Sequence, residues 1–212
     1  MPYRPTERTR TAAQRRRSLL LGESARLVAS GGFAAAKVKT IADRCEVSVG
    51  TVYSYFDSRS ELLAEVFRAA AARELSVVGE AVHAAGPGAP EKVDALVATF
   101  ASRALRGRRR AWSLLFEPVD PAVEAERLRF RVSYVALGEA VLREGIAAGE
   151  LTSQRPEITA AAVVGAIAEA LVGRLTPPVG DDASARTTGD HAVTDTDVVT
   201  EIQLFCRRAI GA

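Results

Sequence analysis

The chain has 212 residues, of which 48% are hydrophobic and 25% are charged, and its net charge is +2. This balance is typical of a soluble globular protein and excludes a disordered chain. The sequence has no run of the roughly 18 apolar residues that a membrane-spanning helix needs, and its N-terminus lacks a signal-type core. We therefore expect a cytoplasmic protein that does not bind a membrane.

The charge is unevenly distributed. Residues 1–60 hold eleven Lys and Arg against five Asp and Glu, whereas residues 61–212 hold seventeen against twenty-one. A basic segment of this kind is suited to an anionic partner, although a solvated basic tail has the same composition. Charge alone therefore does not decide between a segment that binds nucleic acid and a solvated tail.

The residue types that carry catalysis or bind metals are scarce. Two cysteines, Cys45 and Cys206, and two histidines, His83 and His191, form neither a disulfide framework nor a metal-ligand pattern. A glycine-rich phosphate loop, a nucleophile elbow, a His-Glu metal motif and convincing paired carboxylates are all lacking. We expect no cofactor, no metal and no catalytic residue.

Apolar residues recur at helical spacing almost everywhere, so the predicted fold is all-α with about nine helices. The first helix is expected over residues 11–30, ending at Gly31-Gly32, and a short helix over residues 37–45. A second short helix opens at Ser48, a residue suited to N-capping. Two short helices bury little alone, so they should pack on the first helix and leave the second short helix facing outward.

Longer helices are expected after residue 57. The pattern Ser58-Arg59-Ser60-Glu61 is typical of a capping box at the start of a helix that reaches about residue 85. Pro90, Pro121 and Pro156 fit the first turns of three further helices. The basic corner 106–110 leads into a short apolar helix between the first two of these.

Three further features of this region are predicted. Arg127, Arg129 and Arg131 are expected on a solvated face, because they are two residues apart. Residues 176–193 are polar with Pro and Gly, and we expect a mobile loop there. Thr194 and Asp197 should cap the last helix.

The segment 41–56 carries the strongest functional pattern. Val49 and Gly50 keep the outward helix slim, and Thr51 offers a hydroxyl and a methyl group to base edges. Hydroxyls and positive charges nearby can contact phosphates. The alternative that Val52 and Phe56 are core residues is accepted, and Tyr53 is expected to serve both roles. The candidate DNA-contacting residues are Lys37, Lys39, Thr40, Ser48, Val49, Gly50, Thr51, Tyr53, Ser54, Tyr55 and Arg59.

The same segment resembles the N-terminal domain of the tetracycline-repressor (TetR/AcrR) family. The resemblance extends from Leu20-Leu21 to Glu61-Leu62-Leu63, and between them it includes Gly32-Phe33, Ile41-Ala42, Val47-Ser48, Gly50-Thr51, Tyr53 and Phe56. It implies an all-helical homodimer, in which three N-terminal helices bind DNA and a divergent helical domain senses a ligand. Ligand binding would then shift the spacing of the two DNA-binding domains and release the operator.

The chain departs from the family pattern at three positions. Glu46 stands where the family usually has glycine in the turn, Arg59 where it has lysine, and Lys37 where it has threonine. Arg59 is expected to preserve a phosphate contact. At Glu46 the sequence does not determine the geometry of the turn, because residues other than glycine rarely adopt the positive φ that a glycine in this turn would allow.

The resemblance and the residues together predict two domains, an N-terminal arm with a helix-turn-helix domain at 1–60 and a helical effector-binding and dimerisation domain at 61–212. The expected function is a transcription repressor released from an inverted-repeat operator by a small molecule. Its expected partners are double-stranded DNA, a second copy of the chain and a small apolar or amphipathic effector. An activator or a protein-responsive regulator is the alternative, and an enzyme is a remote third. The arginine-rich arm either contacts DNA or is a solubilising tail.

Periodicity alone assigns two surfaces of the second domain. Helices four to seven should enclose an effector cavity, although each aromatic wall residue taken singly is more often plain core. His83, Arg103 and Glu169 are candidate polar groups to orient a ligand, and a surface position is an equally good explanation for each. The eighth and ninth helices should pair with their copies in a four-helix bundle, with an intrachain core as the alternative. The candidate cavity residues are Phe67, Phe100, Arg103, Trp112, Phe116 and Tyr134. The candidate dimer residues are Ala161, Gly165, Ala168, Val172, Val198, Ile202, Phe205 and Ile210.

Overall fold

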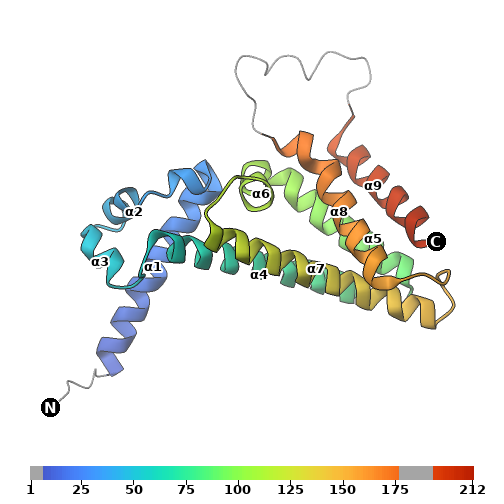
Figure 1. Cartoon of the computed structure of the whole chain (residues 1–212), viewed down its shortest axis with the longest axis horizontal. Helices are drawn as coiled ribbons and strands as arrows, with labels where there is room; N and C mark the ends of the chain where they lie inside the picture. The colour runs from blue at the N-terminus through green and yellow to red at the C-terminus, as the bar shows by residue number, and fades with distance from the viewer. Residues whose placement is uncertain (1–6, 177–192) are drawn as a thin grey trace.

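The computed structural model describes residues 7–176 and 193–212, and over these ranges the chain is helical with no strand (Figure 1). This confirms the predicted all-α class. The first elements are α1 (Glu7–Gly31), the short 3-10 helix η1 (Phe33–Ala35), α2 (Val38–Arg44), α3 (Val49–Tyr53) and α4 (Arg59–Ala84). They are followed by α5 (Ala89–Arg106), α6 (Arg108–Leu115), α7 (Pro121–Ala147), α8 (Pro156–Leu175) and α9 (Asp195–Ile210).

The helix ends follow their capping residues. The Ser48 side chain accepts a hydrogen bond from the backbone N–H of Thr51 at 3.0 Å, and a full capping box links Thr194 and Asp197. The box predicted at Ser58 forms only in part: its hydroxyl accepts from the Glu61 N–H, but the Glu61 carboxylate accepts from the N–H of Asp57. The first helix begins by residue 7, earlier than expected.

The long helices α4 and α7 lie side by side and connect the two ends of the molecule (Figure 1). Helices α1 to α3 gather at one end, and α5, α8 and α9 pack at the other. Helix α6 lies between them and contacts both α1 and α8. The mobile loop predicted at 176–193 falls almost entirely on residues 177–192, which lie outside the described residues.

Two apolar cores hold this arrangement. The first joins α1, α2, α3 and the N-terminal half of α4, and the second joins the C-terminal half of α4 to α5, α7, α8 and α9. Phe130 of α7 packs against both cores. Because α4 contributes to each core, a displacement at one end of the molecule can reach the other through a continuous helix. The boundary at residue 60 stays a prediction.

Helix α8 is apolar around most of its circumference. Within the described residues it is the one helix long and apolar enough to cross a membrane by length and composition. A core helix passes the same test, and Val163, Ile167 and Leu171 of α8 are buried against the second core. Gly138 of α7 faces Ala160 of α8, where a Cβ would make an ordinary van der Waals contact at 3.5 Å.

Candidate DNA-binding surface and ligand cavity

Helix α3 is anchored on one side and open on the other. Val52 and Phe56 are buried in the first core, which fixes the orientation of this five-residue helix. The opposite face carries Val49 and Tyr53, whose exposed fractions are 40% and 47%. Large apolar and aromatic side chains at this exposure make a surface suited to contact with another molecule.

The predicted DNA-contacting residues surround this open face. Gly50 has no packing reason to be glycine, because a Cβ there would meet only the Ser48 hydroxyl, at 3.7 Å. The Ser48 and Thr51 hydroxyls lie 2.9 Å apart at the start of the helix. Lys37, Lys39, Ser48, Gly50 and Ser54 are exposed, and Thr40, Thr51 and Tyr55 are half-buried.

The turn between α2 and α3 keeps a conformation that favours glycine. Glu46 has a φ of 54°, and among the described residues it is the only one other than glycine with a positive φ. The N–H of Val47 donates to the carbonyl of Ala42 at 3.0 Å and closes the turn. The departure from the family pattern at Glu46 therefore leaves the turn intact but strained.

Arg59 does not point away from the protein, as a phosphate contact would require. Its Nε donates to the carbonyl of Ala36 at 3.1 Å and one Nη to the carbonyl of Phe33 at 2.6 Å, while the other Nη lies 4.0 Å from the Asp120 carboxylate. The structure thus differs from the expectation, because the carbonyls at the end of η1 recruit the guanidinium. Arg59 supports the position of η1 instead.

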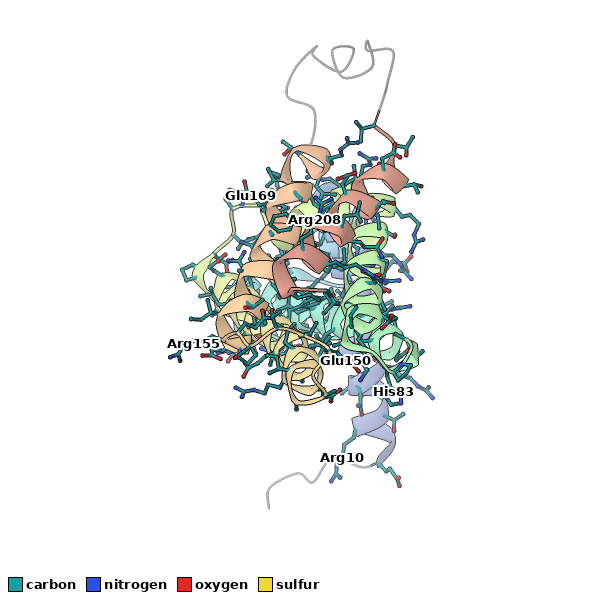
Figure 2. All side chains as sticks on the ribbon, turned by 90° about the vertical axis from the view of Figure 1, so that its right-hand side faces the viewer. Arg10, His83, Glu150, Arg155, Glu169 and Arg208 are labelled. Carbon is teal, nitrogen blue, oxygen red and sulfur yellow. The ribbon has the colours of Figure 1, made fainter. Side chains whose placement is uncertain are left out.

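The N-terminal part of α1 adds positive charge at the same end of the molecule. Arg10, Arg15 and Arg16 are exposed, and Figure 2 shows Arg10 on the free end of α1, which extends away from the helices of the second core. Arg17 lies over the Phe56 ring at 4.8 Å and pairs with Glu65. The basic surplus predicted from the sequence is therefore presented by a helix that packs beside α2.

A cavity of about 290 Å³ opens between α4, α5, α6 and α7, and a second of about 40 Å³ adjoins it. Of the candidate cavity residues, Phe67, Phe100 and Arg103 line the larger cavity and Tyr134 lines the smaller one, while their role in ligand binding stays a prediction. Trp112 and Phe116 line neither, because they pack on each other with ring centroids 5.4 Å apart. His83 borders a separate groove at the far end of α4, and Glu169 is exposed on the outside of α8 (Figure 2).

Sequence reasoning missed the charged group at the mouth of the larger cavity. Glu74 of α4 accepts two hydrogen bonds from Arg103 of α5, at 2.7 and 3.0 Å, and one from Arg110 of α6. Burial opposes the charge of Glu74, but the hydrogen bonds from Arg103 and the charge of Arg110 outweigh it and lower the pKa of this carboxyl. Arg106 also lines the cavity.

Tyr134 is the one cavity residue among those described whose polar atom is buried without a partner. Its exposed fraction is 3%, and its hydroxyl has no hydrogen-bond partner. The ring lies edge-on to Phe100 and Phe130, at 5.2 and 5.3 Å between centroids. Burial raises the pKa of this phenol, so the hydroxyl stays a donor at neutral pH.

The link between cavity and DNA-binding helices is made by α6 and the loop after it. Leu114 and Leu115 of α6 line the larger cavity. Glu117 in the loop accepts hydrogen bonds from the N–H groups of Phe33 and Ala34, at 3.1 and 3.2 Å. Arg109, on another face of α6, donates to the carbonyl of Gly31 at 2.7 Å.

Two further residues fix this junction. Gly32 has a φ of 80°, and a Cβ there would overlap the Glu117 carboxylate, so glycine is required on both grounds. Arg127 donates to the carbonyls of Leu114 and Glu117, at 2.9 and 2.8 Å. The prediction that Arg127 is solvated was wrong, because it binds one carbonyl in the last turn of α6 and one just after the helix, where carbonyls lack helical partners.

The outer face of α8 and α9 is made of small and apolar residues. Ala161 and Gly165 are exposed, Ala168, Val172 and Val198 are half-buried, and Phe205 and Ile158 are 55% and 62% exposed. Ile202 and Ile210 were expected on this face but are buried in the second core. The face is therefore narrower than predicted, with Phe205 as its largest side chain on α9.

Comparisons with known proteins agree with this geometry. Residues 20–66 match the family described as "Bacterial regulatory proteins, tetR family". The HTH-type transcriptional repressor KstR from Mycobacterium tuberculosis (strain ATCC 25618 / H37Rv) is 38% identical over 52 residues, which cover 24% of each chain, and KstR from Rhodococcus jostii (strain RHA1) gives the same values. The match thus spans about a quarter of the length of these curated relatives, and it falls on one quarter of this chain.

Solved structures resemble the whole fold. FadR, a fatty acid degradation regulator from Bacillus halodurans, has a TM-score of 0.69 at 17% identity and covers 90% of this chain and 94% of its own. FadR from Bacillus subtilis, solved in complex with stearoyl-CoA, has a TM-score of 0.66 at 17% identity and covers 87% and 96%. These likenesses concern the fold alone. Residues 20–66 are thus similar to the N-terminal domain of the tetR family of bacterial regulatory proteins, and the rest of the chain is similar to its solved members in fold alone.

Proposed function

We propose that this protein is a sequence-specific DNA-binding transcription regulator, and that it represses genes until a small molecule releases it from its operator. One observation carries the proposal: α3 is anchored by Val52 and Phe56 while its opposite face, with Val49 and Tyr53, is open. An exposed short helix held by two others is the arrangement that enters the major groove in helix-turn-helix proteins.

The residues of this surface divide into two kinds of contact. Thr51 and Gly50 are placed to approach base edges, since a hydroxyl and a methyl group can discriminate bases and glycine allows close approach. Lys37 and Lys39 at the start of α2 and the exposed hydroxyls of Tyr53 and Ser54 are placed to contact phosphates. Arg59 stays out of this set, because its guanidinium holds the carbonyls of η1.

The outer face of α8 and α9 supports a homodimer. Exposed Ala161 and Gly165 let a second helix approach closely, and exposed Phe205 supplies apolar area beside them. Two copies related by a two-fold axis would form a four-helix bundle and place two α3 helices on one side. The operator would then be an inverted repeat, with half-sites about 34–36 Å or a multiple of it apart.

The cavity and the junction support control by an effector. Helix α6 lines the cavity with Leu114 and Leu115 and holds η1 through Arg109 and Glu117. A ligand that displaces α6 therefore moves the attachment point of the DNA-binding helices. FadR from Bacillus subtilis has the same fold and was solved with stearoyl-CoA, an amphipathic molecule.

A mobility-shift titration tests this function. The probes are the DNA region beside the protein's own gene and a random duplex of the same length, each measured at several salt concentrations. The proposal predicts tighter binding to the first probe, with affinity falling as salt rises because phosphate contacts release counterions. Equal affinity for both probes would refute sequence-specific regulation.

A further inference from the structure

The two cavities form one cleft whose lining is mostly apolar, with Arg127 and Arg131 in the smaller part and a charged cluster in the larger part. They share the side chains of Phe100, Leu115 and Phe130 as a common wall. Phe67, Ala71 and Ala104 complete the apolar lining of the larger part. With a volume of about 290 Å³, that part is near the lower end of the roughly 300–1,000 Å³ typical of ligand pockets. The cleft is therefore sized for a small molecule.

Charged side chains gather at one end of this cleft. Arg103, Arg106 and Arg110 line it together with a single carboxylate, that of Glu74. Glu74 is already paired with Arg103 and Arg110, and Arg106 has no hydrogen bond or ion pair with any described residue. Three guanidiniums against one carboxylate leave an excess of positive charge and unused N–H donors, which favour an anion and repel a cation.

The N-terminus of α6 also lies at the cleft, beside these guanidinium groups. Gly107 is the N-cap of this eight-residue helix, lines the cavity and provides no capping side chain. The first N–H groups of a helix lack intrahelical partners and carry a partial positive charge. Gly107 is also the C-cap of α5, whose end carries a partial negative charge, so the guanidinium groups and not the helix end provide the attraction for an anion.

A polar group lies in the smaller part of the cleft, within electrostatic range of Glu74 and Arg103. The hydroxyl of Tyr134 is buried and has no hydrogen-bond partner among the described residues, although buried polar groups are almost always paired. Tyr134 lines the smaller cavity, where Phe100 and Phe130 flank its ring. Because no described residue accepts a hydrogen bond from this hydroxyl, it is free to donate one to an oxygen atom of a ligand.

The geometry points to an anionic amphiphile as the ligand of this cleft: an acyl chain or apolar body of similar size that carries a carboxylate or phosphate group. Arg106 and Arg110 hold the anion, and the apolar part lies along Phe100 and Phe130. This inference rests on the proposed function only in treating the ligand as the effector. The ligand class itself follows from the charge and the shape of the cleft.

Isothermal titration calorimetry of the full-length protein without DNA tests the ligand class. The probes share a ten-carbon chain and differ in charge: decanoate, decan-1-ol and decyltrimethylammonium. Decanoate should bind at least tenfold more tightly than decan-1-ol, and the cation should bind more weakly than either. Binding of decan-1-ol or of the cation as tight as that of decanoate would overturn the inference. Decanoyl-CoA is compared with decanoate in the same series, so that the tighter of the two identifies a free acid or a thioester as the source of the anion.

Variants locate the anion. The double substitution Arg106→Gln and Arg110→Gln should weaken the binding of decanoate at least tenfold. The two guanidinium groups that would bind the anion are then lost, while the ion pair between Glu74 and Arg103 is kept. The matched control is Arg108→Gln in the same basic corner, since Arg108 pairs with Asp195 of α9 and lies outside the lining of the cleft. An equal loss in the control, or an unchanged affinity in the double variant, would contradict the assignment.

The role of the Tyr134 hydroxyl in ligand binding is tested separately. Tyr134→Phe removes only the hydroxyl and should weaken 10-hydroxydecanoate at least threefold more than decanoate. An equal effect on both probes would contradict a role for this donor. All these titrations omit DNA, so a protein that binds decanoate but not its promoter would refute the proposed function alone, and the reverse result would refute this inference alone.

Discussion

The carboxylate of Glu117 accepts a hydrogen bond from the backbone N–H of Phe33 across 84 positions of sequence, with an N···O distance of 3.1 Å. Its second oxygen accepts from the N–H of Ala34 at 3.2 Å. One side chain after α6 thus holds the start of η1, while α6 itself lines the ligand cleft. This contact connects the helix that lines the cleft to the helices that carry α3, beside the stacking of Phe67, a cleft residue, on Phe33.

Glu117→Gln should reduce the coupling between the cleft and DNA. An amide keeps the shape of the carboxylate but offers one acceptor oxygen instead of two, so one N–H of η1 loses its partner at a cost of about 1–3 kcal/mol. The measurement is the ratio of DNA dissociation constants with and without saturating decanoate. The ratio should fall towards one in Glu117→Gln and stay at the wild-type value in Glu139→Gln, a half-buried carboxylate of α7 that pairs with Arg143. A wild-type ratio in Glu117→Gln would contradict the coupling.

Gly50→Ala should separate folding from DNA binding. The added methyl group meets open space in the free protein, so stability should stay the same or rise by up to about 1 kcal/mol. In contact with a base edge the same group would be overpacked, at a cost of about 1–3 kcal/mol in DNA affinity.

Gly79→Ala on α4 is the matched control for that substitution, because a Cβ there meets nothing within 4 Å and the one at Gly50 meets only the Ser48 hydroxyl, at 3.7 Å. It should leave DNA affinity unchanged. Chemical denaturation and fluorescence anisotropy give the two quantities. DNA affinity retained in full by Gly50→Ala would show that α3 does not approach bases closely.

Glu46→Gly should stabilise the protein. Glu46 has a φ of 54°, a left-handed conformation that costs about 1–2 kcal/mol for residues other than glycine. Glycine removes this strain but adds freedom to the unfolded chain, so the expected net gain is about 0.5–1 kcal/mol. Glu46→Ala keeps the strain and should show no gain. Urea denaturation compares the three proteins, and a loss of stability in Glu46→Gly would contradict the strained turn.

Phe205→Glu should convert the dimer to a monomer. Phe205 is more than half exposed on the outer face of α9, beside the small residues of α8, and two-fold symmetry would bring the new charge into the interface twice. Leu19→Glu places the same charge on a large exposed residue of α1 at the other end of the molecule. Light scattering after size exclusion should show a monomer for the first variant and a dimer for the second. A dimeric Phe205→Glu variant would exclude this face.

Local signals predicted most of the helices, because caps and glycine stops act within a few residues. Ser48, Thr194 and the proline at the start of α7 mark helix starts that the structure confirms. Glu46 shows the limit of such rules: its left-handed turn persists against the preference for glycine, since the packing of α2 and α3 on α1 outweighs the local cost. Tertiary packing, which a single sequence does not reveal, decides such positions.

The cavity and the interface were less predictable, because they depend on how each helix is rotated about its axis. Successive residues of a helix lie about 100° apart, so Trp112 packs on Phe116 while its neighbour Ala111 lines the cleft. Ile202 and Phe205 share one stripe in sequence, yet the first is buried and the second exposed. The contacts of Glu74 and Glu117 join residues 29 to 84 positions apart, and no local pattern indicates them.

The account depends most on whether Thr51 faces base edges in the major groove. The direct measurement is the affinity of the wild-type protein and of Thr51→Ala for the operator and for its single base-pair variants. We predict that Thr51→Ala weakens operator binding by about 1–3 kcal/mol. This loss should depend on one pair of symmetry-related base pairs, so Thr51→Ala should cause no loss on duplexes in which those base pairs are changed. A loss that is the same on every duplex, including random sequence, or no loss on any, would contradict recognition by α3.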